Sequence, residues 1–280
     1  MNKDNNQIMA LINAYKMDGL GNDFVIIDRR KNSINLTKEK IVELGSRSNI
    51  GFDQIIFIEK QKEDSYPITI YNSDGGEVSA CGNGARCVAY LLSENLNKKK
   101  IQIKTNNRLL NAKIVGDFQV ELEMGIPLFG SEEIPLSKKI NPSNVVLDIN
   151  DQKFSEGFCV NVGNPHIIFF DKDYLKHDLR VIGPKIENHN LFPEKTNVTF
   201  ANVIDKKNIE VKVWERGAGL TKACGTAACA TAVASFSKNL TERKVQIAFD
   251  QGSLKIEYNK DKNIFMTGPV SKINELSISI

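Results

Sequence analysis

One segment of this chain occurs twice, and the repeat constrains the fold more than any other feature of the sequence. Residues 71–82 (YNSDGGEVSACG) align without a gap on residues 214–225 (WERGAGLTKACG), at an offset of 143 positions. Each copy ends in a Cys-Gly pair, with the cysteines at Cys81 and Cys224. The plain interpretation is an internal duplication, so the chain is expected to form two lobes built on one plan.

Each copy predicts the same local structure, which is a strand followed by a glycine-containing loop and a helix. Residues 68–71 and 211–214 are β-type runs. After the first Cys-Gly pair, apolar residues recur at helical spacing from Ala85 to Leu92. After the second pair, residues 227–234 are small and apolar nearly all round. Both helices are therefore expected in the interior of their lobes.

The two repeated cysteines stand where these helices begin. The first N–H groups of a helix have no intrahelical partner, and the macrodipole places about half a positive charge at that end. Both effects favour a thiolate over a thiol, so thiolate character is predicted for Cys81 and Cys224. The other three cysteines, Cys87, Cys159 and Cys229, are predicted to be small core residues.

Polar residues recur before matching strands in the two copies. Asn22 precedes a predicted strand at 24–28, and Asn164 precedes one at 167–170. In the same way Gln54 stands before the run 55–59 and Asn197 before 198–204, again 143 positions apart. These matching positions extend the duplication well beyond the cysteine segment. In the first lobe, Thr37 is also a predicted N-cap for a helix that ends near Ser46, with Ile41 and Leu44 on its inner face.

The duplication also predicts where the lobes end. Each copy closes with a methionine shortly before a proline, at residues 124–127 and 266–269. The first lobe is therefore predicted to comprise residues 10–127 together with 270–280, and the second residues 128–269. The alternating tail at 276–280 is expected to pair back onto the first lobe.

Composition excludes several functional classes. The 280 residues are 41% hydrophobic and 25% charged, with a net charge of +3, which gives no indication of a nucleic-acid partner. No run reaches the roughly 18 apolar residues that span a bilayer, and the N-terminal apolar segment is too short for a signal peptide. A cytoplasmic protein without a membrane partner is expected. Residues 1 to about 9 are polar and are predicted to extend outside the fold.

Cysteine usage agrees with a reducing compartment. Five cysteines, an odd number without a CxxC pair, indicate reduced thiols rather than a disulfide framework or a zinc site.

A duplicated cysteine has a specific chemical consequence if the lobes face each other. Equivalent loops would then meet across a cleft, and Cys81 and Cys224 would flank one ligand. Two thiols on opposite faces of a carbon can remove a proton from one side and return it on the other, which inverts the centre. The helix N-termini at Gly82-Asn83 and Gly225-Thr226 would hold a carboxylate and stabilise the developing negative charge. This pattern predicts a racemase or epimerase that needs no cofactor.

Ionisation of the thiols requires help, because a free thiol with a pKa of about 8.5 is only a few per cent ionised at neutral pH. Glu215 and His166 are candidates to accept or relay the thiol proton. The Asn-Pro-His context of His166 and its place in the repeat favour this role, whereas His177 and His189 are predicted to be surface residues.

Six segments together resemble a known family. GLGNDF, GFDQI, YNSDGGEVSACGNGARC, VGNPH, TNV and WERGAGLTKACGTAACA are similar, in this order and from about residue 14 onward, to the diaminopimelate epimerases. The resemblance implies two pseudo-symmetric α+β lobes, each a mostly antiparallel or mixed sheet wrapped around a central helix. It implies no metal, no pyridoxal phosphate or other cofactor, and a role in lysine and cell-wall precursor synthesis. It also makes the chain a candidate homodimer.

The resemblance also implies residue roles. Cys81 and Cys224 correspond to the acid/base pair, and His166 and Glu215 to their polar partners. Diaminopimelate would be held by Asn22, Gln54, Asn72, Gly82, Asn83, Asn164, Asn197, Glu215, Arg216, Gly225 and Thr226. Arg216 suits a carboxylate, and asparagine carbonyls suit an ammonium group. One departure is Ala227, where the family usually has glycine; its methyl group is expected to tighten the carboxylate cradle slightly.

Two alternatives remain at this stage. A proline racemase-like enzyme would have a similar fold and also two cysteines, but a single-headed substrate would leave Arg216 and the asparagines unpaired, at about 1–3 kcal/mol per buried group. A non-catalytic thiol module would use Cys81 and Cys224 as a redox sensor or metal ligands. Epimerase activity that survives chelator treatment would exclude the metal-binding alternative.

Overall fold

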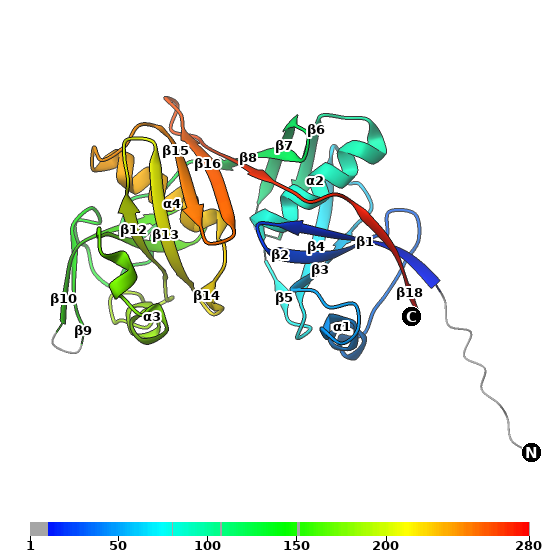
Figure 1. Ribbon diagram of the computed structural model, residues 1–280, viewed down its shortest axis with the longest axis horizontal. Helices are drawn as coiled ribbons and strands as arrows, with labels where there is room; N and C mark the ends of the chain where they lie inside the picture. Colours follow the sequence, from blue (N-terminus) through cyan, green and yellow to red (C-terminus); the bar gives the residue numbers. More distant parts are fainter. Residues whose placement is uncertain (1–10, 80, 107, 150–151, 280) are drawn as a thin grey trace, which may run out of the picture. The chain divides into compact units, whose positions relative to one another are not determined.

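A computed structural model describes residues 11–79, 81–106, 108–149 and 152–279 (Figure 1). The predicted extension at residues 1–9 lies outside the described residues. The chain divides into two compact units, unit 1 with Met1–Asn111 and Val270–Ile280, and unit 2 with Ala112–Pro269. Residues 112–127, which the predicted lobe boundary gives to the first lobe, group with unit 2. Strand pairing within unit 2 accounts for this, because residues 119–125 pair with 264–269.

Unit 1 is a mixed sheet with two helices. Its elements are β1 (Leu11–Gly19), β2 (Asn22–Asp28), α1 (Lys38–Gly45), β3 (Gln54–Ile58), β4 (Ser65–Asn72), β5 (Glu77–Val78), α2 (Gly82–Leu96), β6 (Lys100–Lys104) and β18 (Asn274–Ser279), while β7 (Leu109–Gly116) spans the division between the units. Strand β1 lies antiparallel between β2 and β18, with Ile12 opposite Ile278. The prediction that the C-terminal tail pairs back onto the first lobe is confirmed for the described residues.

Unit 2 follows the same plan with more strands. Its elements are β8 (Gln119–Gly125), β9 (Val145–Ile149), β10 (Gln152–Asn161), β11 (Pro165–Phe170), a 3-10 turn (Tyr174–Lys176), α3 (Leu179–Glu187), β12 (Asn197–Val203), β13 (Asn208–Glu215), β14 (Gly219–Thr221), α4 (Gly225–Ser237), β15 (Lys244–Phe249), β16 (Gly252–Tyr258) and β17 (Ile264–Pro269). Strands β15, β16, β17 and β8 form an antiparallel run.

The strand register repeats as the sequence does. Strand β2 is parallel to β3 with Phe24 opposite Gln54, and β11 is parallel to β12 with His166 opposite Asn197. Strand β4 is antiparallel to β3 in unit 1, and β13 is antiparallel to β12 in unit 2. The short strands before the cysteines also match, because β5 pairs Val78 with Ile70 and β14 pairs Thr221 with Val213. Because even single pairs recur at the repeat offset, the two units share one backbone plan.

The two cysteine helices lie inside their units, as predicted. Helix α4 is buried along most of its length and contacts strands β10, β11, β12, β15, β16 and β17. Helix α2 contacts β1, β2 and β6, and most of its residues are also buried. The prediction of α+β units in which a sheet wraps a central helix is therefore confirmed. Cys87, Cys159 and Cys229 are fully buried, as expected of core residues.

Helix α1 shows how local sequence sets an element. The hydroxyl of Thr37 accepts a hydrogen bond from the N–H of Lys40, which satisfies one of the free donors at the helix N-terminus. Ile41 and Leu44 point into an apolar cluster with residues of β1, β2, β3 and β18. The predicted cap and inner face are confirmed.

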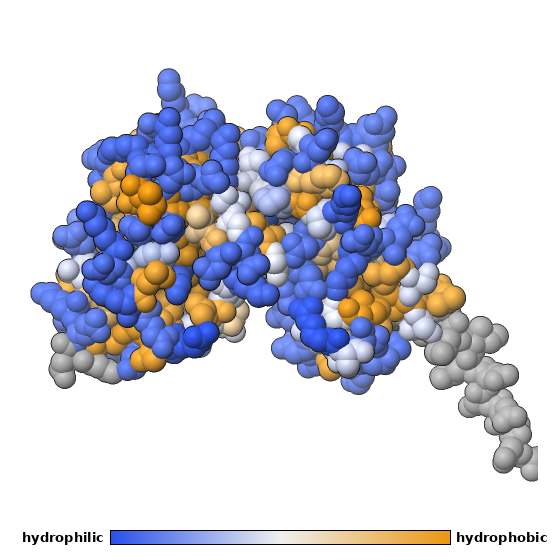
Figure 2. Space-filling model, viewed as in Figure 1, coloured by the Kyte–Doolittle hydropathy of each residue, from blue (hydrophilic) through white to orange (hydrophobic). Residues whose placement is uncertain are grey.

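The face of the molecule seen in Figure 2 is mainly hydrophilic, with scattered apolar residues. Isolated exposed apolar side chains are normal in folded proteins. Within the described parts of the chain, every helix is too short or too polar to traverse a lipid bilayer.

Candidate active site

Cys81 is the N-cap of α2 and is half-buried. Its extended backbone, with φ −145° and ψ 114°, turns the chain from the preceding loop into the helix. The sulfur accepts a hydrogen bond from the N–H of Gly84 at 3.4 Å, and the thiol donates to Oδ1 of Asn22 at 3.6 Å. The sulfur therefore acts as a side-chain cap while its proton is directed to a neutral amide oxygen.

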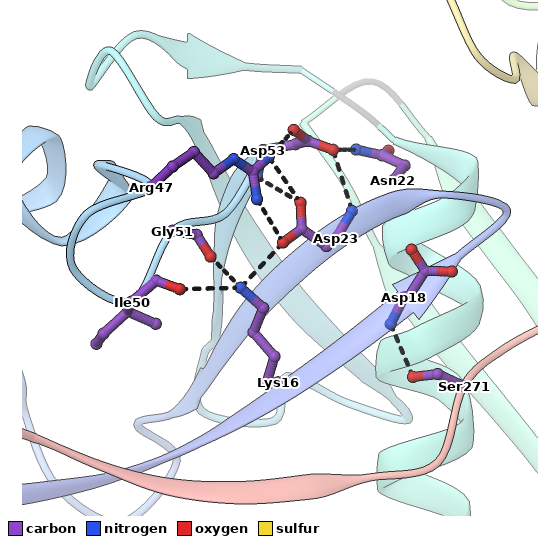
Figure 3. A network of polar contacts seen from close by, with 9 residues as sticks. All are labelled: Lys16, Asp18, Asn22, Asp23, Arg47, Ile50, Gly51, Asp53 and Ser271. Carbon is purple, nitrogen blue, oxygen red and sulfur yellow. Dashed lines mark hydrogen bonds and ion pairs between the residues drawn. The ribbon is translucent and has the colours of Figure 1, made fainter.

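Asn22 is held in turn by a charged network (Figure 3). Its Nδ2 donates to Oδ2 of Asp53 at 3.0 Å, and Asp53 also pairs with Arg47. Asp23 pairs with Arg47 at 2.8 Å and with Lys16 at 2.9 Å. Burial acts to raise the pKa of Asp23, but hydrogen bonds from Arg47 and Lys16 outweigh it and hold that pKa at about 2.

Four further predicted residues of unit 1 lie at the start of β3, at the end of β4 and at the start of α2. Nε2 of Gln54 donates to Oδ1 of Asn72 at 3.0 Å, while the buried Oε1 of Gln54 has no hydrogen-bond partner among the described residues. Asn83 is buried, and its Oδ1 accepts from the fully buried Arg86 at 2.9 Å. The side chain of Asn83 thus supports the helix start, and Gly82 precedes it with no side chain to block the backbone.

Cys224 occupies the matching position in unit 2, as the N-cap of α4, but in a different environment. It is 5% exposed, and its sulfur lies 3.4 Å from the hydroxyl of Thr226. Burial raises the pKa of Cys224 well above its usual value, and the negative charge of Glu215 raises it further, whereas Thr226 and the N–H of Ala227 act to lower it. The predicted thiolate character is therefore wrong for Cys224 in this structure, because desolvation and a neighbouring carboxylate outweigh the helix N-terminus.

Glu215 supplies a carboxylate beside Cys224. It ends strand β13, where its Oε1 accepts from the hydroxyl of Thr221 at 2.5 Å. Burial raises the pKa of Glu215, while hydrogen bonds from Thr221 and Cys224 act to lower it. A carboxylate with a raised pKa accepts a proton more readily than an ordinary glutamate. The predicted association of Glu215 with a cysteine is present in unit 2.

His166 is fully buried in β11 and is neutral at physiological pH. Burial, and secondarily the positive charge of Arg216, lower its pKa to about 3. Its Nε2 lies 2.9 Å from Oδ1 of Asn164, so Nε2 carries the proton and Nδ1 carries the lone pair. Nδ1 has no hydrogen-bond partner within the described part of the chain. The ring is therefore a neutral group whose Nδ1 can accept a hydrogen bond, while burial opposes its full protonation.

Asn197 and Arg216 are joined through the backbone. The buried amide of Asn197 donates to the carbonyl of Pro165 at 2.7 Å and accepts from the N–H of Arg216 at 2.9 Å. Nη1 of Arg216 donates to the carbonyl of Glu194 at 3.0 Å, and its side chain is exposed. Asn197 thus links the ends of three segments, and the guanidinium of Arg216 keeps other N–H groups for a ligand.

Two residues that support the site were not predicted from the sequence. Asp53 orients Asn22, and the only signal was its place directly before Gln54. Glu187, at the end of α3, is buried and accepts from Nε1 of Trp214 at 2.7 Å and from the N–H of Gly217 at 2.9 Å. It braces the turn that carries Glu215 and Arg216, and its sequence context gives no indication of this.

The predicted residues therefore form two sets, one in each unit. The unit 1 set comprises Asn22, Gln54, Asn72, Cys81, Gly82 and Asn83; the unit 2 set comprises Asn164, His166, Asn197, Glu215, Arg216, Cys224, Gly225 and Thr226. Among the described residues, no three His, Cys, Asp or Glu side chains gather in a way that would hold a metal ion.

Solved structures place this fold among known enzymes. A PhzF-family phenazine biosynthesis protein from Bacillus anthracis matches with a TM-score of 0.66 at 17% identity, over 97% of this chain and 100% of that chain. A probable proline racemase from Agrobacterium radiobacter matches with a TM-score of 0.67 at 11% identity, over 96% and 93%. Such low identities establish the fold alone.

Sequence comparisons establish the family. The family model described as diaminopimelate epimerase matches residues 14–129 and 158–273. The diaminopimelate epimerase of Pelagibacter ubique is 53% identical over 96% of this chain and 99% of its own length, and that of Caulobacter vibrioides is 40% identical over 91% and 93%. The chain belongs to the diaminopimelate epimerase family and is an isomerase of the racemase and epimerase class. The proline racemase-like alternative shares its fold but not this level of identity.

Proposed function

We propose that this enzyme interconverts LL- and meso-diaminopimelate without a cofactor, with Cys81 and Cys224 as the acid/base pair. The observation that carries the proposal is the placement of one cysteine at the N-terminus of the buried helix in each repeated unit. Family membership and 53% identity to the Pelagibacter ubique enzyme support the substrate.

The chemistry follows from the two protonation states of a thiol. One cysteine, as a thiolate, removes the α-proton from one face of the carbon, and the other, as a thiol, delivers a proton to the opposite face. The raised pKa of Cys224 keeps it in the protonated thiol form in the resting enzyme, and Glu215 provides a local acceptor for that proton when Cys224 must act as the base. The family resemblance also assigns His166 to the acid/base machinery, where its low pKa suits a neutral ring that accepts a hydrogen bond through Nδ1 rather than a base that takes the proton outright.

Stabilisation of the carbanionic intermediate is assigned to the helix N-termini. Backbone N–H groups at Gly82-Asn83 and Gly225-Thr226 would bind the carboxylate that gains negative charge as the α-proton leaves. A side chain at position 225 would meet Met266, since an added Cβ would lie 2.9 Å from its sulfur. The close approach of Met266 explains the need for glycine there.

The distal head of the substrate requires charged and amide groups. Arg216 would bind the distal carboxylate, and carbonyl oxygens of Asn22, Asn72 and Asn164 together with Glu215 would bind the distal ammonium group. Gln54 and Asn197 are assigned to the same head. The unpartnered Oε1 of Gln54 is consistent with such a contact, because a buried acceptor without a partner is otherwise destabilising.

Hydrogen exchange at the α-carbon tests the proposal directly. In deuterated water, the enzyme with LL-diaminopimelate should produce the meso isomer with deuterium at the inverted carbon, because the delivered proton comes from a thiol that exchanges with solvent. Mass spectrometry and chiral chromatography would follow both events. Inversion without deuterium uptake, or no turnover of diaminopimelate, would contradict the proposal.

The wider setting is also part of the proposal. The reaction would supply lysine and peptidoglycan precursor synthesis, in line with the family resemblance. A cytoplasmic location and a homodimer stay predictions.

A further inference from the structure

The protonation state of Cys81 depends on which end of an amide faces it. Oδ1 of Asn22 lies 3.6 Å from the sulfur and can only accept, so it favours the protonated thiol. With the amide reversed, Nδ2 would face the sulfur and donate to it, which would favour the thiolate. The orientation of Asn22 therefore selects between the acid and the base form of Cys81.

Asp53 fixes that orientation. Its Oδ2 accepts from Nδ2 of Asn22 at 3.0 Å and from the N–H of Asp23 at 3.1 Å (Figure 3). A reversed amide would set Oδ1 of Asn22 against this carboxylate oxygen, where neither atom can donate. The carboxylate of Asp53 thus leaves only one orientation that satisfies both ends of the amide.

Asp53 is itself held on several sides. Its N–H donates to the carbonyl of Asp23 at 3.0 Å and to Oδ1 of Asp23 at 3.1 Å, and its other carboxylate oxygen pairs with Arg47. The position aligned with Asp53 in unit 2 is Thr196, whose hydroxyl donates to the carbonyl of Asn197. Asn164, the counterpart of Asn22, directs its carbonyl to His166 rather than to Cys224. The chain of hydrogen bonds from Asp53 through Asn22 to Cys81 is thus present in unit 1, and the corresponding residues of unit 2 make different contacts.

We infer that Asp53 is a positioning residue that, through Asn22, keeps Cys81 in its protonated, proton-donating form when no substrate is bound. The inference rests on the proposed function only in treating Cys81 as an acid/base group. It adds a residue that touches neither the sulfur nor the substrate.

The test is the pH dependence of alkylation of Cys81 by iodoacetamide, followed by peptide mass spectrometry on the full-length protein without substrate. Asp53→Ala frees the amide of Asn22 to reverse. The pH midpoint for alkylation should fall by about one unit, which makes alkylation about tenfold faster at pH 7, since the thiolate is the reactive form.

Two control variants separate orientation from general loss of the network. Asp53→Asn can keep a carbonyl oxygen where Asn22 and the N–H of Asp23 donate, so its profile should stay within about twofold of wild type. Arg47→Gln removes the ion pair but leaves the contact between Asp53 and Asn22, so its profile should also be unchanged. If Asp53→Ala does not fold, Asn22→Ala carries the test, because removal of the carbonyl acceptor should lower the midpoint in the same way.

An unchanged alkylation profile in folded Asp53→Ala or in Asn22→Ala would overturn the inference. So would an equal shift in Asp53→Asn, because the effect would then come from the lost negative charge. An equal shift in Arg47→Gln would also overturn it, because the effect would then come from general loss of the network. The measurement needs no turnover, so failure of the wild type to epimerise diaminopimelate would contradict the proposed function and leave this test intact.

Discussion

The two cysteine sites share a backbone and differ in chemistry. Cys81 and Cys224 both cap a buried helix after a matching strand and loop. The thiol of Cys81 donates to the neutral amide of Asn22, whereas that of Cys224 lies against the carboxylate of Glu215. At the position of Glu215, unit 1 has Asn72, which pairs with Gln54 instead. Duplication has therefore preserved the framework, while the burial and the polar neighbours of each cysteine have diverged.

The comparison also shows the limit of an argument from the helix N-terminus alone. A helix N-terminus stabilises a nearby negative charge by about 0.3–1 kcal/mol, or by up to about 2 kcal/mol in a partly buried geometry. Desolvation of a fully buried ionisable group shifts a pKa by up to about 3–5 units, at about 1.4 kcal/mol per unit. Burial therefore prevails at Cys224, and its thiol stays protonated unless Glu215 or the substrate changes its surroundings.

The largest expected effect comes from removal of either sulfur. Cys81→Ala and Cys224→Ala should each lower kcat for epimerisation by about 10³-fold or more, because inversion needs both a donor and an acceptor. Chiral chromatography of the products would measure this, and Cys159→Ala, a buried cysteine outside the site, is the control. Near-wild-type turnover in either variant would show that the two sites are not partners in one reaction.

Replacement of Glu215 should make the Cys224 site resemble the Cys81 site. Glu215→Gln removes the local proton acceptor, so kcat should fall by about 10²-fold or more. It also removes the negative charge that helps raise the pKa of Cys224, so alkylation of Cys224 should begin at a lower pH than in wild type. Asn72→Ala changes the matching position in unit 1 without changing charge, so the pH profile for alkylation of Cys81 in this variant should stay that of wild type. If Glu215→Gln kept the wild-type profile at Cys224, the contrast between the two sites would not depend on this carboxylate.

Much of the framework that the two cysteine sites share could be predicted from the sequence. The repeat predicted both helices and the cysteine at the start of each, because helical spacing of apolar residues follows each Cys-Gly pair. The family resemblance implied a mostly antiparallel or mixed sheet, but not which strands pair. Glu215 could be predicted because it stands in the repeated segment. Asp53 and Glu187 could not, since their roles depend on contacts across 31 and 30 positions of sequence that no local pattern encodes. The burial that raises the pKa of Cys224 is likewise a property of the packed unit.

A smaller effect is expected at Arg216, whose counterpart in the repeat is Ser73. Arg216→Lys keeps the charge but loses the planar fork that binds a carboxylate through two N–H groups, so KM for diaminopimelate should rise by about tenfold with a smaller change in kcat. Steady-state kinetics in both directions would measure it. Lys212→Arg, on strand β13 just before the turn that carries Arg216, is a control for altered charge geometry. An unchanged KM would remove Arg216 from substrate binding.

The smallest effect concerns acid stability, and it belongs to unit 1. The pKa of Asp23 is about 2 in the folded protein, against 3.8 for an ordinary aspartate. A lowered pKa stabilises the fold at pH above about 4, and this stabilisation is lost as the pH falls towards 2. Asp23→Asn should therefore unfold more easily in urea at pH 7 and show a shallower loss of stability between pH 4 and pH 2. The exposed Asp261→Asn is the control. An equal pH dependence in both variants would show that the network adds no acid sensitivity.

The pairing of β18 with β1 has a consequence for how the chain folds as it is made. Unit 2 is one continuous stretch, whereas the sheet of unit 1 joins residues 11–16 to residues 274–279. During synthesis from the N-terminus, every strand of unit 2 leaves the ribosome before the last strand of unit 1 is available. Until then β1 has a free edge opposite the missing strand, and such an edge is a template for pairing with other chains. The lobe that is encoded first is thus completed last, and its unfinished sheet is where a nascent chain most needs protection from aggregation.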